Sequence, residues 1–308
     1  MKYLKLIRWP NLVIIALVQY LIRFFIIESL SVPHFLTDVW FAVGVLCSIS
    51  LAAAGYIIND IFDKSNDHHN KPDRVLVGKS ITENTAWVIY ASFNIIAFIS
   101  GYLLAQHIEM PGLWMLPVVA AALLYLYSID LKKRAVIGNL LVSLLTALPV
   151  FLVAVYDILP AANADNAELI KPIFYVIIAY SVFAFYTNFI REIIKDAEDL
   201  EGDSAQGFKT LAVILGRDYI RYVIVILALV LLVFTGYFNG YLFYSDIYSS
   251  IYILLFINLP IAYVIYKVIV AKKKQDFKQA STLMKLIMLT GILSMVVFTL
   301  SLTIGASL

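Results

Sequence analysis

Apolar residues gather in nine long, continuous stretches, which are separated by shorter polar segments. A helix that crosses a bilayer needs about 20 mostly apolar residues, whereas a strand of a membrane barrel alternates apolar and polar positions over about 10 residues. Because the stretches are long and continuous, each predicts a membrane-spanning α-helix. The predicted spans are residues 11–29, 39–59, 82–106, 113–129, 137–157, 171–191, 219–237, 250–270 and 283–305.

The composition excludes a water-soluble globular protein. Of the 308 residues, 62% are hydrophobic and 14% are charged, and the mean hydropathy is +0.88, whereas soluble domains are about 45–50% apolar and about 25% charged. Nine spans leave no room for a separate soluble module, so we expect one all-α domain over residues 1–308. Cys47 is the single cysteine, which excludes an internal disulfide and a cysteine-based metal site.

The basic residues indicate how the chain lies in the membrane. The connections on one side of the predicted spans hold 21 of the 23 Lys and Arg residues, and connections of this kind usually stay in the cytoplasm. We therefore expect an integral, multi-pass protein of the inner or plasma membrane with a cytoplasmic N-terminus and an external C-terminus. The run Lys272–Lys274 is expected to serve only as a topology signal and an anchor to anionic lipid.

Arg23 is an exception because it lies inside the first predicted span. A charge inside a membrane is costly and indicates a functional role by default. Three interpretations remain open: Arg23 pairs with Glu28, contacts a substrate, or extends to a membrane surface.

Two acidic segments with the same spacing lie at the ends of the second and sixth predicted spans. Each contains the pattern D-x2-D-x3-D, and steps of three and four place all three carboxylates on one face of a helix. Since the segments lie four helices apart, they indicate a weak internal repeat of four helices followed by a ninth. The aspartates are Asp60, Asp63 and Asp67 in the first segment, and Asp196, Asp199 and Asp203 in the second.

The two acidic segments predict a site for hard cations. Carboxylates at one-turn spacing repel one another, so a cation is needed to hold them together. Oxygen ligands favour Mg²⁺, which completes its coordination with water and substrate phosphate. His68 and His69 are expected to be solvated, because the site has enough oxygen donors without them. Two Mg²⁺ ions and a bound diphosphate are therefore predicted, with basic partners among Arg74, Lys132, Arg191 and Lys195.

At these motifs the chain resembles the UbiA superfamily of intramembrane prenyltransferases. The segment Asn59–Asp67 matches the family pattern N-D-x2-D-x3-D, and Asp199–Asp203 matches the later D-x3-D. The connection from Tyr127 to Arg134, followed by Gly138-Asn139, is similar to the family's Y-S-x2-L-K-R…G-N segment, and the opening Arg8-Trp9-Pro10 is also family-like. The resemblance covers the whole chain and includes the count of nine helices.

The resemblance implies an enzyme that transfers a polyprenyl group after its diphosphate ionises to an allylic carbocation. It implies a central cavity inside the bundle and helical cytoplasmic caps formed by the loops 64–81 and 195–212, which would exclude water. Tyr127 would stabilise the carbocation, although it also fits an ordinary interfacial aromatic residue. The implied metal ligands are Asn59, Asp60, Asp63, Asp67, Asp196, Asp199 and Asp203, and the implied substrate contacts are Asn59, Arg8, Arg74, Lys132, Arg191 and Lys195.

Two segments bear on the acceptor of the prenyl group. The run Asn70–Arg74 most resembles the branches of digeranylgeranylglyceryl phosphate synthases and chlorophyll synthases. The run Arg191–Asp203 resembles the first of these branches, which implies transfer onto geranylgeranylglyceryl phosphate. The stretch Val75–Lys79 departs from that branch, which usually has P-x-P-S-G there. An aromatic acceptor such as 4-hydroxybenzoate, or another quinone precursor, therefore stays open.

Two other classes of membrane protein fit the sequence less well. A multi-span transporter would bind its substrate near the bilayer midplane, whereas the acidic segments here lie at the ends of predicted helices. A CDP-alcohol phosphotransferase also has acidic helix ends, but its D-G-x2-A-R opening is absent from this sequence. Nothing in the sequence indicates a nucleic-acid partner.

Overall fold

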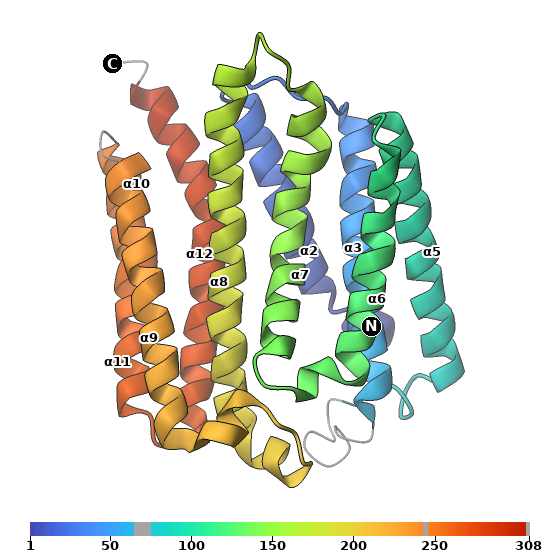
Figure 1. The fold of residues 1–308 in the computed structure, drawn as a ribbon, viewed down its shortest axis with the longest axis vertical. Helices are drawn as coiled ribbons and strands as arrows, with labels where there is room; N and C mark the ends of the chain where they lie inside the picture. The colour runs from blue at the N-terminus through green and yellow to red at the C-terminus, as the bar shows by residue number, and fades with distance from the viewer. Residues whose placement is uncertain (65–74, 243–245, 306–308) are drawn as a thin grey trace. The chain divides into compact units, whose positions relative to one another are not determined.

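The computed structural model describes residues 1–64, 75–242 and 246–305, and these residues are almost entirely helical (Figure 1). Within them there is no β-strand, and nine helical stretches are long and apolar enough to cross a membrane. The predicted all-α class and the number of spans are thereby confirmed. The stretches are Trp9–Glu28, Asp38–Phe62, Glu83–His107, Pro111–Ile129, Ile137–Ala161, Ala167–Ala205, Leu211–Tyr241, Ile247–Val270 and Lys274–Leu302.

The chain divides into two compact units, and each is described by itself. The first unit contains Met1–Tyr20, Pro33–Lys132 and Leu148–Phe174. In this unit α3 packs along α5 and α6 (Figure 1). Its elements are α1 (Lys2–Leu6), most of α2 (Trp9–Leu21), α3 (Asp38–Phe62), α5 (Glu83–His107), η2 (Pro111–Trp114), α6 (Met115–Ile129), most of η3 (Leu131–Lys133), the end of α7 (Ile137–Val153), η4 (Ala154–Ile158), η5 (Leu159–Ala161) and the start of α8 (Ala167–Ala205).

The second unit contains Leu21–Val32, Lys133–Ala147 and Tyr175–Leu308. Its core is a continuous group of buried aliphatic side chains from α8, α9, α11 and α12, with the fully buried Phe277 among them. Its further elements are η1 (Ile22–Glu28), the first part of α7, most of α8, α9 (Leu211–Leu242), α10 (Ile247–Ile253), η6 (Leu254–Asn258), α11 (Leu259–Val270) and α12 (Lys274–Gly305).

Three spans contain a π-helical turn, in which the backbone hydrogen bonds join residues five apart rather than four. The π turns are η1 in the first span, η4 in the fifth and η6 in the eighth. Hydropathy does not register such turns, because an extra residue leaves the apolar composition unchanged. The sequence therefore predicted these spans as uninterrupted α-helices.

The sixth and ninth spans begin or end well outside their predicted limits. α8 runs unbroken for 39 residues to Ala205, so it includes most of the polar segment 195–212, which was predicted to be helical but outside the span. Gly207 follows with φ 72 and Gly216 with φ 75, backbone conformations that glycine adopts without steric cost. The other predicted cap, 64–81, lies mostly outside the described residues. The central cavity, the caps, the internal repeat and the single-domain organisation stay predictions.

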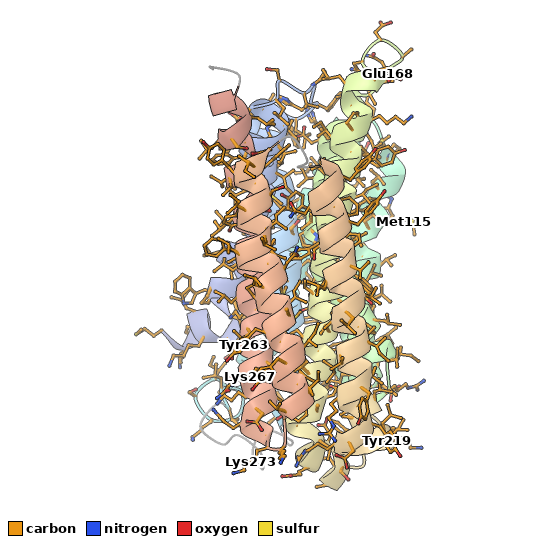
Figure 2. All side chains as sticks on the ribbon, turned by 90° about the vertical axis from the view of Figure 1, so that its left-hand side faces the viewer. Met115, Glu168, Tyr219, Tyr263, Lys267 and Lys273 are labelled. Carbon is orange, nitrogen blue, oxygen red and sulfur yellow. The ribbon has the colours of Figure 1, made fainter. Side chains whose placement is uncertain are left out.

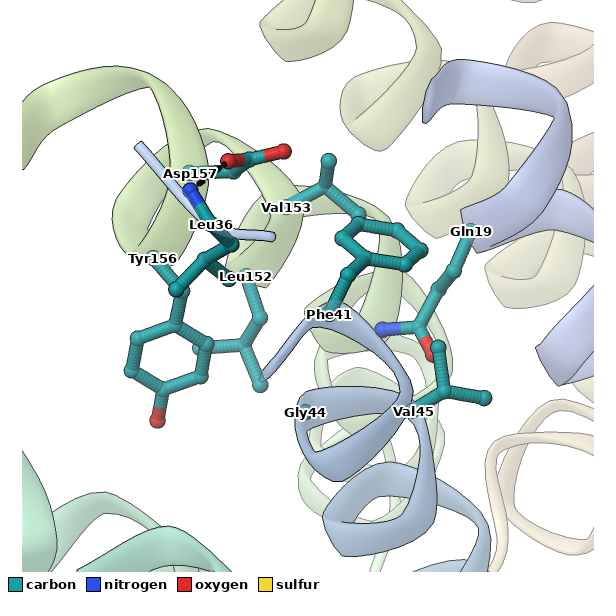
Figure 3. Close-up of a pocket in the computed structure, with 9 residues that line it drawn as sticks. All are labelled: Gln19, Leu36, Phe41, Gly44, Val45, Leu152, Val153, Tyr156 and Asp157. Atoms are coloured by element: carbon teal, nitrogen blue, oxygen red, sulfur yellow. Dashed lines mark hydrogen bonds between the residues drawn. The ribbon is translucent and has the colours of Figure 1, made fainter. Parts of the chain in front are cut away.

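A small cavity in the first unit is closed by two buried polar side chains (Figure 3). The Asp157 carboxylate, fully buried in η4, accepts hydrogen bonds from the backbone N–H groups of Leu36 (2.8 Å) and Phe35 (3.2 Å). The Gln19 amide donates to Ser48 Oγ (3.1 Å) and to the carbonyl oxygen of Pro149 (2.9 Å). The cavity between them has room for about one water molecule. These contacts fix the segment before α3 onto η4.

Large apolar side chains cover the outer surfaces of the helices, as expected for a protein surrounded by lipid. In the second unit, aromatic and basic side chains collect toward one end of the helices, where Tyr219, Tyr263, Lys267 and Lys273 lie (Figure 2). Lys267 also places its ammonium group 5.6 Å from the centre of the Tyr263 ring. Mixed aromatic and basic belts of this kind mark the boundary between lipid and water.

Candidate active site

The first acidic cluster forms where α3 ends. The backbone N–H of Asp63 donates to the carbonyl oxygen of Asn59 (2.9 Å), so the two residues lie one above the other on the last turn. The Asn59 amide then donates to Asp63 Oδ2 (2.8 Å). Asp60 lies between them in sequence and is likewise part of this last turn. The local helical spacing thus brings three of the predicted metal ligands together.

Lys132 joins this cluster from the short η3 segment after α6. Its ammonium group donates to Asp63 Oδ1 (2.5 Å) and to Asn59 Oδ1 (3.2 Å). Only 11% of the Lys132 side chain is exposed, and an ion pair this sheltered is screened less than one on the surface. The structure therefore places a predicted phosphate-binding residue directly against two predicted metal ligands.

Arg8 contacts the same turn of α3 from the N-terminal side. It stands between α1 and α2 with φ 50, a left-handed conformation that breaks the helix and turns the chain. The guanidinium group donates to Asp60 Oδ1 (2.8 Å) and lies 4.9 Å from the centre of the Tyr56 ring. Tyr127 lies in the last turn of α6, a short connection before Lys132. Asp67 and Arg74 lie outside the described residues.

The second acidic cluster lies on the C-terminal part of α8. Because this helix is continuous to Ala205, the predicted alignment of Asp196, Asp199 and Asp203 on one helical face is compatible with the backbone. Lys274, at the start of α12, donates to Asp199 Oδ1 (3.3 Å). The amide of Asn139, in the first turns of α7, donates to Asp196 Oδ2 (2.9 Å).

Two predicted phosphate-binding residues on α8 are held by a neighbouring carboxylate. The Glu192 side chain accepts hydrogen bonds from Arg191 Nη1 (2.6 Å) and from Lys195 Nζ (2.9 Å). Glu192 is 9% exposed, so this carboxylate carries two cationic partners in a sheltered place. The pairing keeps both basic groups beside Asp196 on the same stretch of helix.

Sequence reasoning assigned no site role to three of these partners: Lys274, Glu192 and Asn139. Lys274 belongs to the basic run that is expected only to anchor the protein to lipid, and the structure adds a contact between its ammonium group and Asp199. In the sequence, Asn139 stands out only as part of the family-like Gly138-Asn139 motif. Its position within that motif is the one sequence signal that pointed toward the site.

The donor chemistry of both clusters fits a hard divalent cation. The side chains in question offer carboxylate and amide oxygens, which are the ligands that Mg²⁺ prefers. Among the described residues no group of three His, Cys, Asp or Glu side chains is close enough to hold an ion by itself. An ion here would therefore take part of its coordination from water and from a bound phosphate, as Mg²⁺ commonly does.

Relatives with assigned names share much of this chain. The digeranylgeranylglyceryl phosphate synthase of Saccharolobus solfataricus is 38% identical over 183 residues, which are 59% of each chain. The synthase of the same name from Sulfolobus acidocaldarius is 32% identical over 237 residues, or 76% of each chain. The chain thus spans about three fifths of the length of the first of these relatives and about three quarters of the second.

Solved structures share the fold. One, from work on digeranylgeranylglyceryl phosphate synthase in membranes, has a TM-score of 0.70 and 23% identity and covers 97% of each chain. Another, a UbiA homolog from Archaeoglobus fulgidus bound to GPP and Mg²⁺, has a TM-score of 0.55 and 16% identity and covers 96% of this chain and 100% of that one. At these identities the likeness is one of fold.

The family model covers nearly the whole chain. The description "UbiA prenyltransferase family" matches residues 14–301, a range that contains both acidic clusters, Lys132 and all or most of each span described above. The sequence motifs, the helical fold and this match agree, and the chain belongs to the UbiA prenyltransferase family.

Proposed function

We propose that this protein is a Mg²⁺-dependent prenyltransferase that moves a geranylgeranyl group from its diphosphate to geranylgeranylglyceryl phosphate. The observation that carries the proposal is the arrangement at the end of α3, where an amide, a carboxylate and an ammonium group meet within 3.2 Å. Such a group supplies both ligands for a cation and a positive charge for phosphate oxygens. The acidic cluster on α8 repeats this combination with Lys274, Arg191 and Lys195.

The proposed reaction exchanges one carbon–oxygen bond for another. The bond between the allylic carbon and the diphosphate oxygen breaks, and pyrophosphate leaves with the electron pair. The hydroxyl oxygen of the glycerol then attacks the allylic carbocation and forms an ether bond. The hydroxyl proton is released to pyrophosphate or to water, so atoms and charge balance.

The residues of this chain would act mainly on the diphosphate. When bound, Mg²⁺ would supply positive charge to the leaving oxygens. The ligands of the ions would be Asn59, Asp60, Asp63 and Asp67 at one cluster and Asp196, Asp199 and Asp203 at the other. Basic groups fixed before the reaction stabilise the charge that develops as the bond breaks. Lys132, Arg8, Arg74, Arg191 and Lys195 would bind phosphate oxygens in this way, and Tyr127 would face the carbocation.

The relatives support the choice of acceptor. Both named above are digeranylgeranylglyceryl phosphate synthases, a name that implies a glycerophosphate lipid as the acceptor. The run Arg191–Asp203, which resembles that branch, is also the segment whose charges the structure organises around Glu192. The solved homolog with GPP and Mg²⁺ supports a prenyl diphosphate as the donor.

The experiment is a product assay on the purified full-length protein. Radiolabelled geranylgeranyl diphosphate and Mg²⁺ are supplied, and geranylgeranylglyceryl phosphate or 4-hydroxybenzoate is offered in separate reactions. We expect label to move into an ether lipid, EDTA to stop the transfer and added Mg²⁺ to restore it. The variants Asp63→Ala and Asp199→Ala should each abolish turnover while the protein still folds.

Each part of the proposal has a result that would contradict it. Label found only on the aromatic ring would overturn the acceptor but not the donor chemistry. Transfer that continues in EDTA-treated, metal-free buffer would overturn the role of Mg²⁺. Near-normal activity in either aspartate variant would remove the corresponding cluster from the site.

A further inference from the structure

Asp196 is held by a different kind of side chain from those that pair with Asp60, Asp63 and Asp199. Asp60, Asp63 and Asp199 each accept a hydrogen bond from a cationic side chain, namely Arg8, Lys132 and Lys274. Asp196 instead accepts one from a neutral amide, that of Asn139, at 2.9 Å. A neutral donor fixes one carboxylate oxygen without cancelling the negative charge.

Asn139 belongs to a small group of buried polar residues between α7 and α8. It is 7% exposed, and its backbone carbonyl accepts a hydrogen bond from Ser143 Oγ (2.6 Å), one turn further along α7. Ser143 is fully buried and accepts in turn from the amide of Asn188 on α8 (3.3 Å). α7 and α8 are thus joined by two polar contacts, Asn139 with Asp196 and Ser143 with Asn188.

The spacing of these contacts fixes one helix against the other. Asn139 and Ser143 are four residues apart on α7, and Asn188 and Asp196 are eight apart on α8, so each pair lies on one helical face. Of the two contacts, only the one from Asn139 reaches the acidic cluster. The Asn139 amide meets the Asp196 carboxylate directly, through its own hydrogen bond.

We propose that Asn139 is a positioning residue that holds the Asp196 carboxylate for a divalent cation. This inference rests on the proposed function of the α8 cluster. The amide engages Oδ2, which leaves Oδ1 to face the ion. Partners that orient a metal ligand in this way typically contribute 10–100-fold to metal affinity or activity. A lysine paired with this carboxylate would have to leave before a cation could bind, whereas the neutral amide can stay hydrogen-bonded to Oδ2.

The test measures metal binding without turnover. Mn²⁺ is titrated into the purified full-length protein with a non-reactive thiolodiphosphate analogue of geranylgeranyl diphosphate present, and free Mn²⁺ is followed by electron paramagnetic resonance. The variant Asp196→Asn identifies the site to which Asp196 contributes. We expect Asn139→Ala to weaken Mn²⁺ at that site by about 10–100-fold. The nearly isosteric Asn139→Leu, which keeps the packing volume, should do the same.

Ser143→Ala is the matched control, because it removes the other polar contact between α7 and α8 and leaves Asn139 against Asp196. If Asn139 only joined the helices, both variants would weaken Mn²⁺ alike. We expect Ser143→Ala to bind Mn²⁺ within about twofold of the wild type. In an activity assay, Asn139→Ala should raise the half-saturating Mg²⁺ concentration more than it lowers turnover at saturating Mg²⁺.

A second comparison separates positioning from a general loss of stability. If Asn139 acts through Asp196, adding Asn139→Ala to Asp196→Asn should weaken Mn²⁺ no further, since coupled residues are not additive. Unchanged Mn²⁺ affinity in both Asn139 variants would overturn the inference while the proposed function stands. A wild-type protein that binds no Mn²⁺ would instead contradict the proposed function itself.

Discussion

Lys132 is a largely buried basic residue, and its ammonium group donates to Asn59 and Asp63 at the end of α3. Without a ligand it balances the charge of Asp63. A bound diphosphate would bring negative charge to the end of α3, and its cation would bring positive charge. Lys132 could then bind a phosphate oxygen instead of Asp63, and Asp63 could bind the cation instead of Lys132. Lys132 and Asp63 therefore have to be considered together.

We expect Lys132→Ala to lower turnover by about 10²–10³-fold, as the loss of one preorganised donor does in other enzymes. Lys64→Ala is the control, because Lys64 also pairs with a carboxylate (Glu83, 3.1 Å), but on the exposed surface. Steady-state kinetics with the ether-lipid product assay measure both. Equal turnover in the two variants would show that the sheltered ammonium group takes no part in transfer.

Arg23 resolves one question that the sequence left open. Its Nε lies 2.7 Å from Glu28 Oε1, and its side chain is only 3% exposed, whereas that of Glu28 is 35% exposed. The pairing with Glu28 that was one of three alternatives is thus the one observed. The π-helical turn η1 contains both residues and brings them to the same place.

The unequal exposure of this pair gives a directional prediction. Glu28→Gln leaves a buried positive charge without its carboxylate and should reduce the free energy of unfolding by about 2 kcal/mol. Arg23→Met removes the buried charge and leaves a carboxylate that reaches water, so the loss should be smaller. Thermal denaturation of both variants in the same detergent gives the comparison, and a greater loss in Arg23→Met would contradict it.

The sequence predicted which side chains form the clusters, but not all of their partners. Helical spacing was enough to bring Asn59 and Asp63 together, because both lie on one turn. Asn139 and Lys274 lie 57 and 75 residues from the aspartates that they contact. Such partners depend on how α7 and α12 pack against α8, which a single sequence does not contain.

At the level of elements, hydropathy located every span because a continuous apolar stretch is a strong signal. The largest errors are at the polar ends of α8 and α12, where the helix continues beyond the apolar residues. Polar residues near water continue a helix as readily as apolar ones. Hydropathy therefore predicted the end of α8 too early and the start of α12 too late.

α12 depends on a small residue where it meets α8. A Cβ atom added to Gly291 would lie 2.2 Å from the Phe183 ring, whereas one added to Gly236 on α9 would meet nothing within 4 Å. We expect Gly291→Ala to destabilise the protein by about 1–3 kcal/mol, as overpacking usually does, and Gly236→Ala to change stability little. Thermal denaturation of the two variants tests this.

A compensating change sharpens the same prediction. If the ring of Phe183 causes the loss, Phe183→Leu should restore part of the stability of Gly291→Ala. An additive loss in the double variant would mean that Gly291 is required for a different reason, such as the nearby hydrogen bond between Tyr180 and Ser294 (2.9 Å).

At the level of the whole molecule, family membership and the nine apolar helices of the described residues make this an integral, multi-pass membrane protein. The distribution of Lys and Arg predicts which ends of the helices face the cytoplasm. That orientation would place Lys273 inside the cell and Glu168 outside, and both side chains are exposed.

Cysteine labelling tests this orientation. Cys47 is buried and can be replaced by Ala, after which Glu168→Cys or Lys273→Cys introduces one accessible thiol. We expect a membrane-impermeant maleimide to label Glu168→Cys in intact cells and Lys273→Cys only after the membrane is opened. The reverse pattern would place the acidic clusters on the external side.

The three π turns have a consequence for insertions and deletions. Each of them contains one residue more than an α-helical turn would need, and in a regular helix the loss of one residue rotates everything beyond it by about 100°. Deleting a residue within η6 can be absorbed by tightening that turn into an α-helix, while the faces of the following residues are kept. The same deletion in η4 would withdraw Asp157 from the segment that it holds, and in η1 it would change the spacing that pairs Arg23 with Glu28. Length variation among relatives should therefore collect at η6 and avoid η1 and η4.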